Sequence, residues 1–325
     1  MAANEYSHIP VLLAEVMSYL QPGIGQNIVD ATLGGGGYSR AILKEIGETG
    51  KLLSIDLDQD AIANFRSQIA DLGSQSQISN LKSQIILVHG NFAHIDKIIK
   101  SHGFPGPDGI VADLGLSSYE LDQGGRGISF QKDEPLDMRF DQASENETAA
   151  WILNNKTEAE LSKIFNDYGE EKFTRQIVRK IFEARSRKQE IRKTSELYEI
   201  IKEALPKPVK HKAADSARRV FQALRIAVNH ELENLEEFLP KAFDILAPGG
   251  RLVIVSFHSL EDRMVKQFFV GLTKGCICPI EFPECRCGKN PQGKLLTKKL
   301  VAASAAELET NPRSKPAKLR AIQKL

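Results

Sequence analysis

Four consecutive glycines, Gly34 to Gly37, separate an apolar β-type run from a helix-type run in the stretch IVDATLGGGGYSRAIL. A glycine-rich turn between a strand and a helix lets a ligand approach the backbone closely, although each glycine costs backbone entropy on folding. Two carboxylates flank this turn: Asp30 precedes it, and Asp56 ends the next apolar run, KLLSID. The combination predicts a nucleotide-type ligand, with an acidic side chain placed to bind ribose hydroxyls.

Three ligands are compatible in principle with such a turn. A P-loop requires a Lys-Ser/Thr pair after its second glycine, and Arg40 or Ala41 stands at the lysine position, so a P-loop is excluded. A dinucleotide fingerprint would place its third glycine at Ser39 or Arg40, so that match is partial. S-adenosylmethionine carries no phosphate and needs close backbone approach and an acidic partner. Because Asp56 suits NAD equally well, the acidic residue does not discriminate between these two ligands.

Two further candidates end later β-type runs. Asp113 ends GIVAD, and His258 follows GRLVIVSF. Ligands in doubly wound sheets bind outside the carboxyl ends of the strands, so both residues are candidates for an active site. An Asp in such a place is also a common N-cap or turn residue, and a lone histidine is more often structural. Both interpretations stay open for each residue.

Apolar, β-branched runs alternate with helix-type sequence. Four runs come early and a fifth follows a gap of more than 130 residues; they span 27–33, 51–57, 84–90, 109–115 and 250–257. This alternation predicts an α/β fold with a doubly wound, mostly parallel sheet. A helix over about 231–246 should lead into the fifth strand, and the tail after residue 311 is a candidate for a last strand.

The long gap has a different pattern. Its apolar residues recur at helical spacing, beginning with Leu161, Ile164 and Phe165 and continuing with Ile177, Val178 and Ile181. We therefore predict an inserted all-helical domain over 116–225. The α/β core would then be discontinuous, formed by residues 1–115 and 226–325.

The formal net charge of +1 conceals a segregated pattern. Residues 170–225 carry 16 Lys and Arg against 8 Asp and Glu, and residues 289–325 carry 9 against 2. Two basic regions indicate a surface that binds a polyanion, and solvated helix faces with a basic tail are the alternative. No apolar run is long enough to span a membrane and no secretory signal is visible, which predicts a cytoplasmic protein without a membrane partner.

The four cysteines lie within twelve residues in the stretch CICPIEFPECRC; they are Cys276, Cys278, Cys285 and Cys287. Four thiolates could bind Zn²⁺, but the usual spacing is C-x₂-C rather than the C-x-C found here. Reduced thiols on a proline-rich loop are the alternative. We assign no metal to the catalytic site.

Taken together, these segments resemble the RsmH (MraW) family of 16S ribosomal RNA cytosine-N4 methyltransferases. The stretches that carry the resemblance run from residue 8 to residue 320 and include DATLGGGGYSRAIL, HGNF, DLGLSS, YGEEKFTRQIVRKI and LAPGGRLVIVSFHSLEDRMVK. The resemblance implies a class I methyltransferase core that binds S-adenosyl-L-methionine, with an inserted helical domain that helps to hold 16S ribosomal RNA of the small ribosomal subunit. A nicotinamide-dependent oxidoreductase and a non-catalytic RNA-binding protein are the rival classes. The sequence leaves open whether two copies form a homodimer.

The resemblance also implies the cofactor contacts, which are Gly36, Gly37, Tyr38, Asp56, Phe92, Asp113 and Glu120. Two of them depart from the family pattern, since Tyr38 stands where His is usual and Glu120 stands where Gln is usual. The change to Tyr38 is conservative, because Tyr and His can both pack against a ligand. The change to Glu120 removes an amide N–H donor and adds a negative charge.

Methyl transfer to a cytosine amine requires an acceptor for the amine hydrogens. Asp113 or its loop is the first candidate for this acceptor, and His258 is the second. The target base must leave its stack, so the RNA must be single-stranded or opened. Phosphate contacts are predicted for six arginines of the insert: Arg175, Arg179, Arg185, Arg187, Arg218 and Arg219.

Overall fold

The computed structural model describes residues 10–73, 84–115, 125–275, 278, 284 and 286–325. The chain divides into two compact units, the first formed by 1–117 and 233–325 and the second by 118–232. The predicted insert, 116–225, stops within helix α11 (Ala213–Asn229), whereas the second unit continues to Leu232. The reason is that α11 keeps burying apolar side chains in that unit as far as Val228. No helix among the described residues is long and apolar enough to cross a membrane.

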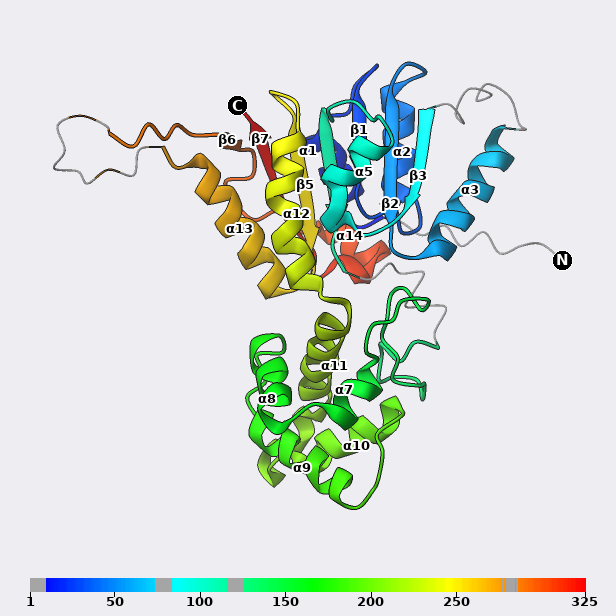
Figure 1. The fold of residues 1–325 in the computed structure, drawn as a ribbon, viewed down its shortest axis with the longest axis vertical. Helices are drawn as coiled ribbons and strands as arrows, with labels where there is room; N and C mark the ends of the chain where they lie inside the picture. Colours follow the sequence, from blue (N-terminus) through cyan, green and yellow to red (C-terminus); the bar gives the residue numbers. More distant parts are fainter. Residues whose placement is uncertain (1–9, 74–83, 116–124, 276–277, 279–283, 285) are drawn as a thin grey trace. The chain divides into compact units, whose positions relative to one another are not determined.

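The first unit is built on one seven-stranded sheet with the order β3-β2-β1-β4-β5-β7-β6 (Figure 1). Strands β1 to β5 are parallel, and β7 runs antiparallel to both β5 and β6. The bounds are β1 Asn27–Asp30, β2 Lys51–Asp56, β3 Ile85–His89, β4 Gly109–Asp113, β5 Arg251–Ser256, β6 Gly293–Leu295 and β7 Lys318–Lys324.

The five predicted parallel strands and the candidate last strand are confirmed. The sequence did not predict β6, because the residues Gly-Lys-Leu contain no β-type alternation. Its three residues form a strand only because β7 offers a free edge to pair with.

Side chains of the parallel strands alternate between two buried faces, as expected for a sheet covered by helices on both sides. On one face, Val29, Ile110 and Ile254 pack against α5, α12 and α13. On the other face, Ile28 and Val253 pack against α1 and α2. The helices of this unit are α1 Leu13–Leu20, α2 Gly37–Ile46, α3 Gln59–Gly73, α5 Ile95–Ser101, α12 Glu231–Ile245, α13 Ser259–Thr273 and α14 Ala305–Thr310.

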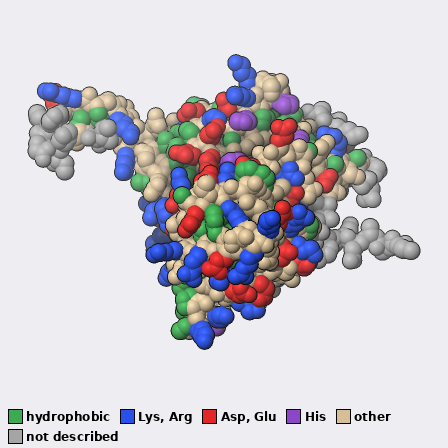
Figure 2. Space-filling view, turned by 60° about the horizontal axis from the view of Figure 1, so that its bottom comes forward, with side chains coloured by type: hydrophobic (Ala, Val, Ile, Leu, Met, Phe, Trp, Pro, Cys, Tyr) green, Lys and Arg blue, Asp and Glu red, His purple; other side chains and the backbone are tan. Residues whose placement is uncertain are grey.

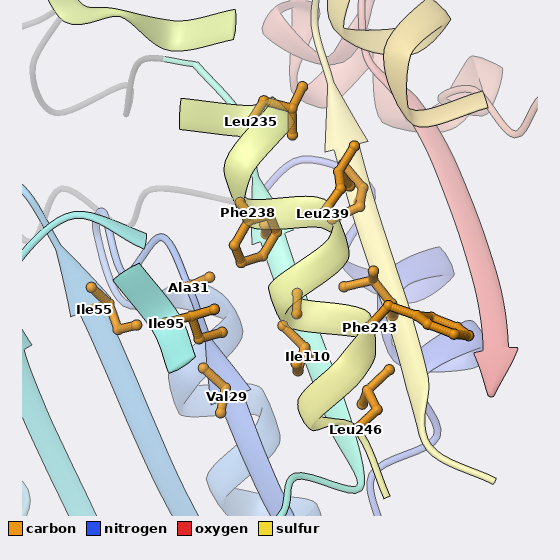
Figure 3. Packing of buried hydrophobic residues seen from close by; sticks show 14 of the residues in the cluster. Val29, Ala31, Ile55, Ile95, Ile110, Leu235, Phe238, Leu239, Phe243 and Leu246 are labelled. Carbon is orange, nitrogen blue, oxygen red and sulfur yellow. The ribbon is translucent and has the colours of Figure 1, made fainter. Parts of the chain in front are cut away.

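Helix α12 covers the centre of the sheet. Its apolar residues recur at the three- and four-residue spacing that places them on one side of a helix, and Figure 3 shows Leu235, Phe238 and Leu239 on the side that faces the strands. Leu239 is 1% exposed. This packing fixes the segment that leads into β5, whose carboxyl end carries Ser256 and His258.

The second unit is all helical and has its own core. Helix α8 begins with a capping box, in which Thr157 and Glu160 bond each other's backbone N–H groups. Helix α11 contacts α7, α8 and α10, so it lies at the centre of the unit. Its helices are α7 Ala149–Asn155, α8 Glu158–Asp167, α9 Thr174–Ser186, α10 Thr194–Ala204 and α11 Ala213–Asn229.

The contact of α12 with the sheet can be tested with a matched pair of variants on that helix. Leu239→Ala should lower the free energy of unfolding by about 2–5 kcal/mol, because a buried leucine loses its contacts and leaves a cavity. Glu236→Ala, at an exposed position of α12, should change it by less than about 0.5 kcal/mol. Differential scanning calorimetry measures both, and equal effects of the two substitutions would contradict this packing.

Candidate active site

Strand order reverses between β1 and β4, which are neighbours in the sheet. In a doubly wound sheet, this reversal opens a crevice outside the carboxyl ends of the strands, where ligands bind. The predicted residues Asp56 and Asp113 end β2 and β4, and the glycine turn follows β1. The topology therefore brings these parts of the predicted site to one edge of the sheet.

The glycine turn leads directly into α2, with Gly36 as its N-cap in the left-handed conformation at φ 73°. A Cβ on Gly36 would lie 2.1 Å from the ring of Phe65, and a Cβ on Gly37 would lie 2.0 Å from Pro10. Both contacts are impossible for real atoms, so the protein's own packing requires these two glycines. This packing fixes the turn at the position where the predicted ligand would approach the backbone.

Asp56 supports the turn from the end of β2. One carboxylate oxygen accepts the N–H of Gly34 at 2.7 Å, and the other accepts the N–H of Asp58 at 2.8 Å. Burial raises the pKa of Asp56 to about 6, although both hydrogen bonds oppose that rise. Asp56 therefore shapes the turn itself and keeps acceptor lone pairs for a ligand.

Arg40, the residue at the lysine position of a P-loop, does not face a ligand. Its guanidinium donates to the carbonyl oxygen of Gly35 at 3.0 Å and to the side chain of Gln68 at 2.5 Å. It also lies over the ring of Phe65, at 5.9 Å from the centroid. This arrangement agrees with the exclusion of a P-loop from the sequence.

Asp30 lies behind the turn and is fully buried. Its carboxylate accepts the hydroxyl of Ser39 at 2.7 Å and the N–H of Thr32 at 3.3 Å. The hydroxyl of Ser39 also lies 2.8 Å from that of Ser54. Burial raises the pKa of Asp30 to about 7, and the negative charge of Asp56 adds to the rise.

Asp113 ends β4 and is held through its backbone, since its N–H donates to the hydroxyl of Thr32 at 2.6 Å. The side-chain oxygen Oδ1 is buried and has no hydrogen-bond partner among the described residues. Burial raises the pKa of Asp113 well above its ordinary value, and the charges of Asp30 and Glu261 raise it further. A buried acceptor without a partner is costly, so this oxygen is suited to an N–H donor of a ligand.

Phe92 opens a short 3₁₀ turn, Phe92–His94, after β3. Its ring packs edge-on against Phe238 at 5.0 Å between centroids, which anchors it to α12. Asn91 caps the turn by accepting the N–H of Ala93, and its amide donates to Asn234 at 2.9 Å. The ring is half-buried, so part of its surface stays open to a ligand.

Tyr38 does not present its phenol to a ligand. The ring is 4% exposed and belongs to the core beneath α2, and the hydroxyl donates to the carbonyl oxygen of Val11. Any contact of Tyr38 with a cofactor must therefore use its backbone. The sequence could not show this, because the partner Val11 lies far from Tyr38 along the chain.

His258 caps helix α13. Its Nδ1 accepts the N–H of Glu261 at 3.4 Å, and a carboxylate oxygen of Glu261 accepts the N–H groups of Phe257 and His258. The Nε2 atom lies 3.2 Å from the other oxygen of Glu261 but has no hydrogen-bond partner among the described residues. The side chain is 8% exposed. This capping role is sufficient to explain the histidine, which leaves Asp113 as the better candidate for the acceptor.

Two site predictions lie outside the described residues. Glu120 falls within 116–124, and two of the four cysteines, Cys276 and Cys285, fall within the segment that follows α13. Of the other two, Cys278 is half-buried and Cys287 is exposed. The contact of Glu120 with the cofactor therefore stays a prediction, and zinc binding and reduced thiols stay the two alternatives for the cysteines.

Of the six predicted RNA-contacting arginines, Arg185 and Arg219 also have structural roles, and their contact with RNA stays a prediction. Arg185 donates to the carbonyl oxygens of Leu153 and Lys156, so it caps the end of α7. Arg219 pairs with the fully buried Glu171 at 2.7 Å. The other four arginines are exposed: Arg175, Arg179, Arg187 and Arg218.

Thr32 and Glu261 were missed from the sequence as site residues. Glu261 could have been found, because His258-Ser-Leu-Glu261 has the spacing of a capping box. Thr32 carries no such signal, because its role depends on the adjacency of β1 and β4 in the sheet.

The geometry fits S-adenosylmethionine better than a dinucleotide. A dinucleotide would bring a negatively charged pyrophosphate to an edge that already holds Asp30, Asp56 and Asp113. S-adenosylmethionine instead brings a sulfonium and an ammonium cation, and its adenine and ribose supply N–H and O–H donors. The doubly wound sheet, the glycine turn after β1 and the acid at the end of β2 therefore define a class I methyltransferase.

The chain belongs to the MraW methylase family, whose sequence model matches residues 5–325. The resemblance found in the sequence is thus confirmed, and the protein is an S-adenosylmethionine-dependent methyltransferase. Ribosomal RNA small subunit methyltransferase H of Heliobacterium modesticaldum is 43% identical, over 98% of this chain and 99% of that protein. The protein of the same name from Clostridium botulinum strain 657 is 45% identical, over 99% of this chain and 100% of its own. A solved rRNA methylase from Streptococcus thermophilus covers 98% of this chain and 99% of its own at 12% identity, with a TM-score of 0.43.

Asp30 gives the site a testable pH dependence. A carboxyl whose pKa is higher in the folded than in the unfolded protein binds protons more tightly when folded, so its stabilisation is lost as pH rises from 3.8 to about 7. The free energy of unfolding of the wild type should fall over this range. For Asp30→Asn the fall should be smaller, and the difference between the two proteins should reach up to about 4 kcal/mol. Urea unfolding at a series of pH values measures this difference. The same pH dependence in both proteins would contradict the buried, protonated state of Asp30.

The structural role of Arg219 is tested against its neighbour Arg218. Arg219→Ala should destabilise the second unit by about 3 kcal/mol, because it leaves the buried carboxylate of Glu171 without its cation. Arg218→Ala removes only an exposed pair with Asp215 and should cost less than about 1 kcal/mol. Unfolding followed by the fluorescence of Trp151, which lies in this unit and is the chain's single tryptophan, reports both. Equal stabilities of the two variants would contradict a structural role of Arg219.

Proposed function

We propose that this methyltransferase transfers the methyl group of S-adenosylmethionine to the exocyclic N4 amine of a cytidine in 16S ribosomal RNA of the small ribosomal subunit. The observation that carries the proposal is the buried Oδ1 of Asp113 at the carboxyl edge of the sheet, which no described residue bonds. The relatives named as ribosomal RNA small subunit methyltransferases support the substrate class. We place the enzyme in the cytoplasm, where ribosomal RNA is available.

Asp113 would act on the amine. The lone pair of the cytosine amine is delocalised into the ring, so a carboxylate that accepts its hydrogens makes the nitrogen a better nucleophile. The nitrogen attacks the sulfonium methyl in line, the carbon–sulfur bond breaks, and S-adenosylhomocysteine leaves. A raised pKa makes Asp113 a stronger base, and the positive charge of the bound cofactor favours its ionised form. The carboxylate then receives the proton that the methylated nitrogen releases.

The other residues of this edge would hold the cofactor. Asp56 accepts ribose hydroxyls, the backbone of Gly36 and Gly37 allows close approach, and Phe92 presents the free part of its ring surface. Tyr38 contributes its backbone, and Glu120 stays in the proposed set as the family resemblance placed it. The turn geometry and the anchoring of Phe92 by Phe238 support these roles.

The second unit would hold RNA through exposed arginines. Four of the six are classed as exposed, namely Arg175, Arg179, Arg187 and Arg218, although Arg179 and Arg218 each lie beside a carboxylate. Figure 2 shows Lys and Arg interspersed with Asp and Glu on the face that it displays. Phosphate contacts on this face would therefore be made by individual arginines and not by one continuous basic surface. Association of two copies into a homodimer stays a prediction that sedimentation can test.

The central test is turnover by Asp113→Asn at saturating S-adenosylmethionine. The variant keeps the shape of the side chain and loses its basicity, so kcat should fall by about 10²–10⁴. The matched control is Asp60→Asn, at an exposed position of α3, which should keep full activity. Methyl-labelled S-adenosylmethionine is incubated with unmodified small-subunit RNA or particles, and the nucleosides are analysed for N4-methylcytidine. Full turnover by Asp113→Asn would exclude it as the acceptor, and a label on another position would refute the proposed product.

A further inference from the structure

The basic C-terminal region of the first unit is divided between cations with a structural role and cations without one. Lys318 and Arg320 approach Asp262, at 3.8 and 2.6 Å. Lys324 donates to the carbonyl oxygens of Asp244 and Leu246 at the end of α12. These three side chains complete the fold and are not available to a partner.

Four other lysines of this region have no such role. Residues 286–306 contain five cations and no Asp or Glu. The lysines in this segment are all exposed, and none of their side chains has a hydrogen bond or ion pair within the part of the chain that the structure describes; they are Lys289, Lys294, Lys298 and Lys299. Four uncompensated charges on one short segment make a strongly positive strip, which we call the lysine strip.

The lysine strip follows the outer edge of the sheet towards the active site. Lys294 lies opposite Gln323 in β7, near the amino ends of the parallel strands. Lys298 and Lys299 lie between Thr297, which bonds Ala321, and Val301, which pairs with Leu319. Figure 1 shows this edge beside β7, on the far side of that strand from β5.

The end of the strip lies in the same row of the sheet as the proposed acceptor. Val301 pairs with Leu319, Leu319 with Val255, and Val255 with Asp113. Neighbouring strands are about 4.8 Å apart, so three steps separate Val301, two residues beyond Lys299, from Asp113 by roughly 15 Å. A short run of nucleotides spans that distance. The strip therefore lies where the backbone of an RNA strand would pass while one of its bases occupies the active site.

Protection of the sheet edge explains only part of the strip. Exposed lysines on an edge strand prevent pairing with another chain, and Lys294 on β6 is placed to do so. Lys289 precedes the strand, however, and Lys298 and Lys299 follow it. Three of the four charges thus lie outside the regular ladder between β6 and β7.

We infer that the lysine strip binds the phosphate backbone of the substrate RNA next to the target cytidine. The inference rests on the proposed function and adds a second RNA-contacting surface, separate from the arginines of the helical unit. Single-stranded RNA supplies the closely spaced negative charges that a strip of lysines recognises without reading sequence.

The test is the salt dependence of binding to a single-stranded fragment of small-subunit RNA, measured by fluorescence anisotropy. The variant is Lys294→Gln/Lys298→Gln/Lys299→Gln. The matched control is Lys44→Gln/Lys51→Gln/Lys100→Gln, which removes the same charge from exposed positions near the amino end of the sheet. Loss of three phosphate contacts should reduce the slope of log K against log salt by about 2, and the control should keep the wild-type slope. In methylation assays, the strip variant should raise KM for RNA and leave kcat and cofactor affinity unchanged.

An unchanged slope in the strip variant would overturn the inference, and the proposed function would stand if the wild type still methylates RNA. Self-association of the strip variant with an unchanged slope would show that the lysines only protect the edge. Weakened binding to an acidic protein with an unchanged slope for RNA would assign the strip to a protein partner. A wild type that neither binds nor methylates small-subunit RNA would refute both the inference and the proposed function.

Discussion

The structure depends on the concentration of carboxyl groups at one edge of its sheet. Asp30, Asp56 and Asp113 end or follow three parallel strands, and Glu261 begins the helix after a fourth. Among the described residues, no Lys or Arg forms an ion pair with the three aspartates; backbone N–H groups and hydroxyls supply their hydrogen bonds. Burial disfavours the charged form of each aspartate, and repulsion from neighbouring carboxylates adds to this effect, so the pKa values of all three rise. Because no Lys or Arg among the described residues balances these three carboxyl groups, the edge favours the binding of a cationic ligand.

The rest of the first unit keeps this edge in place. The amide of Gly34 bonds Asp56, and the packing of Phe65 and Pro10 against Gly36 and Gly37 fixes the turn. Thr32 connects the turn to β4 by accepting the N–H of Asp113. These contacts join β1, β2 and β4 at their carboxyl ends, so the acceptor and the proposed cofactor contacts form one preorganised group.

The sequence predicted the parts of this arrangement that follow from periodicity and from the rule that ligands bind at the carboxyl edge. The parallel strands, Asp56, Asp113 and the all-helical character of the insert follow from patterns visible over ten to twenty residues. The structural roles of Arg185 and Arg219 were not predicted, because their partners, the end of α7 and Glu171, are brought to them only by the packing of the helical unit. The inward direction of the Tyr38 phenol was not predicted for a similar reason, because its acceptor, the carbonyl oxygen of Val11, lies on the segment before α1. Local sequence does not distinguish an arginine that bonds groups of its own fold from an arginine that binds a partner molecule.

The most direct test of a cation-binding carboxyl edge is the number of protons that leave the protein when the cofactor binds. Titration calorimetry at about pH 6.5, in buffers that differ in ionisation enthalpy, measures this number for S-adenosylmethionine and for S-adenosylhomocysteine, which lacks the sulfonium charge. Because a bound cation lowers the pKa of nearby carboxyls, S-adenosylmethionine should release more protons than S-adenosylhomocysteine. Equal proton release by the two ligands, or proton uptake with S-adenosylmethionine, would contradict the account.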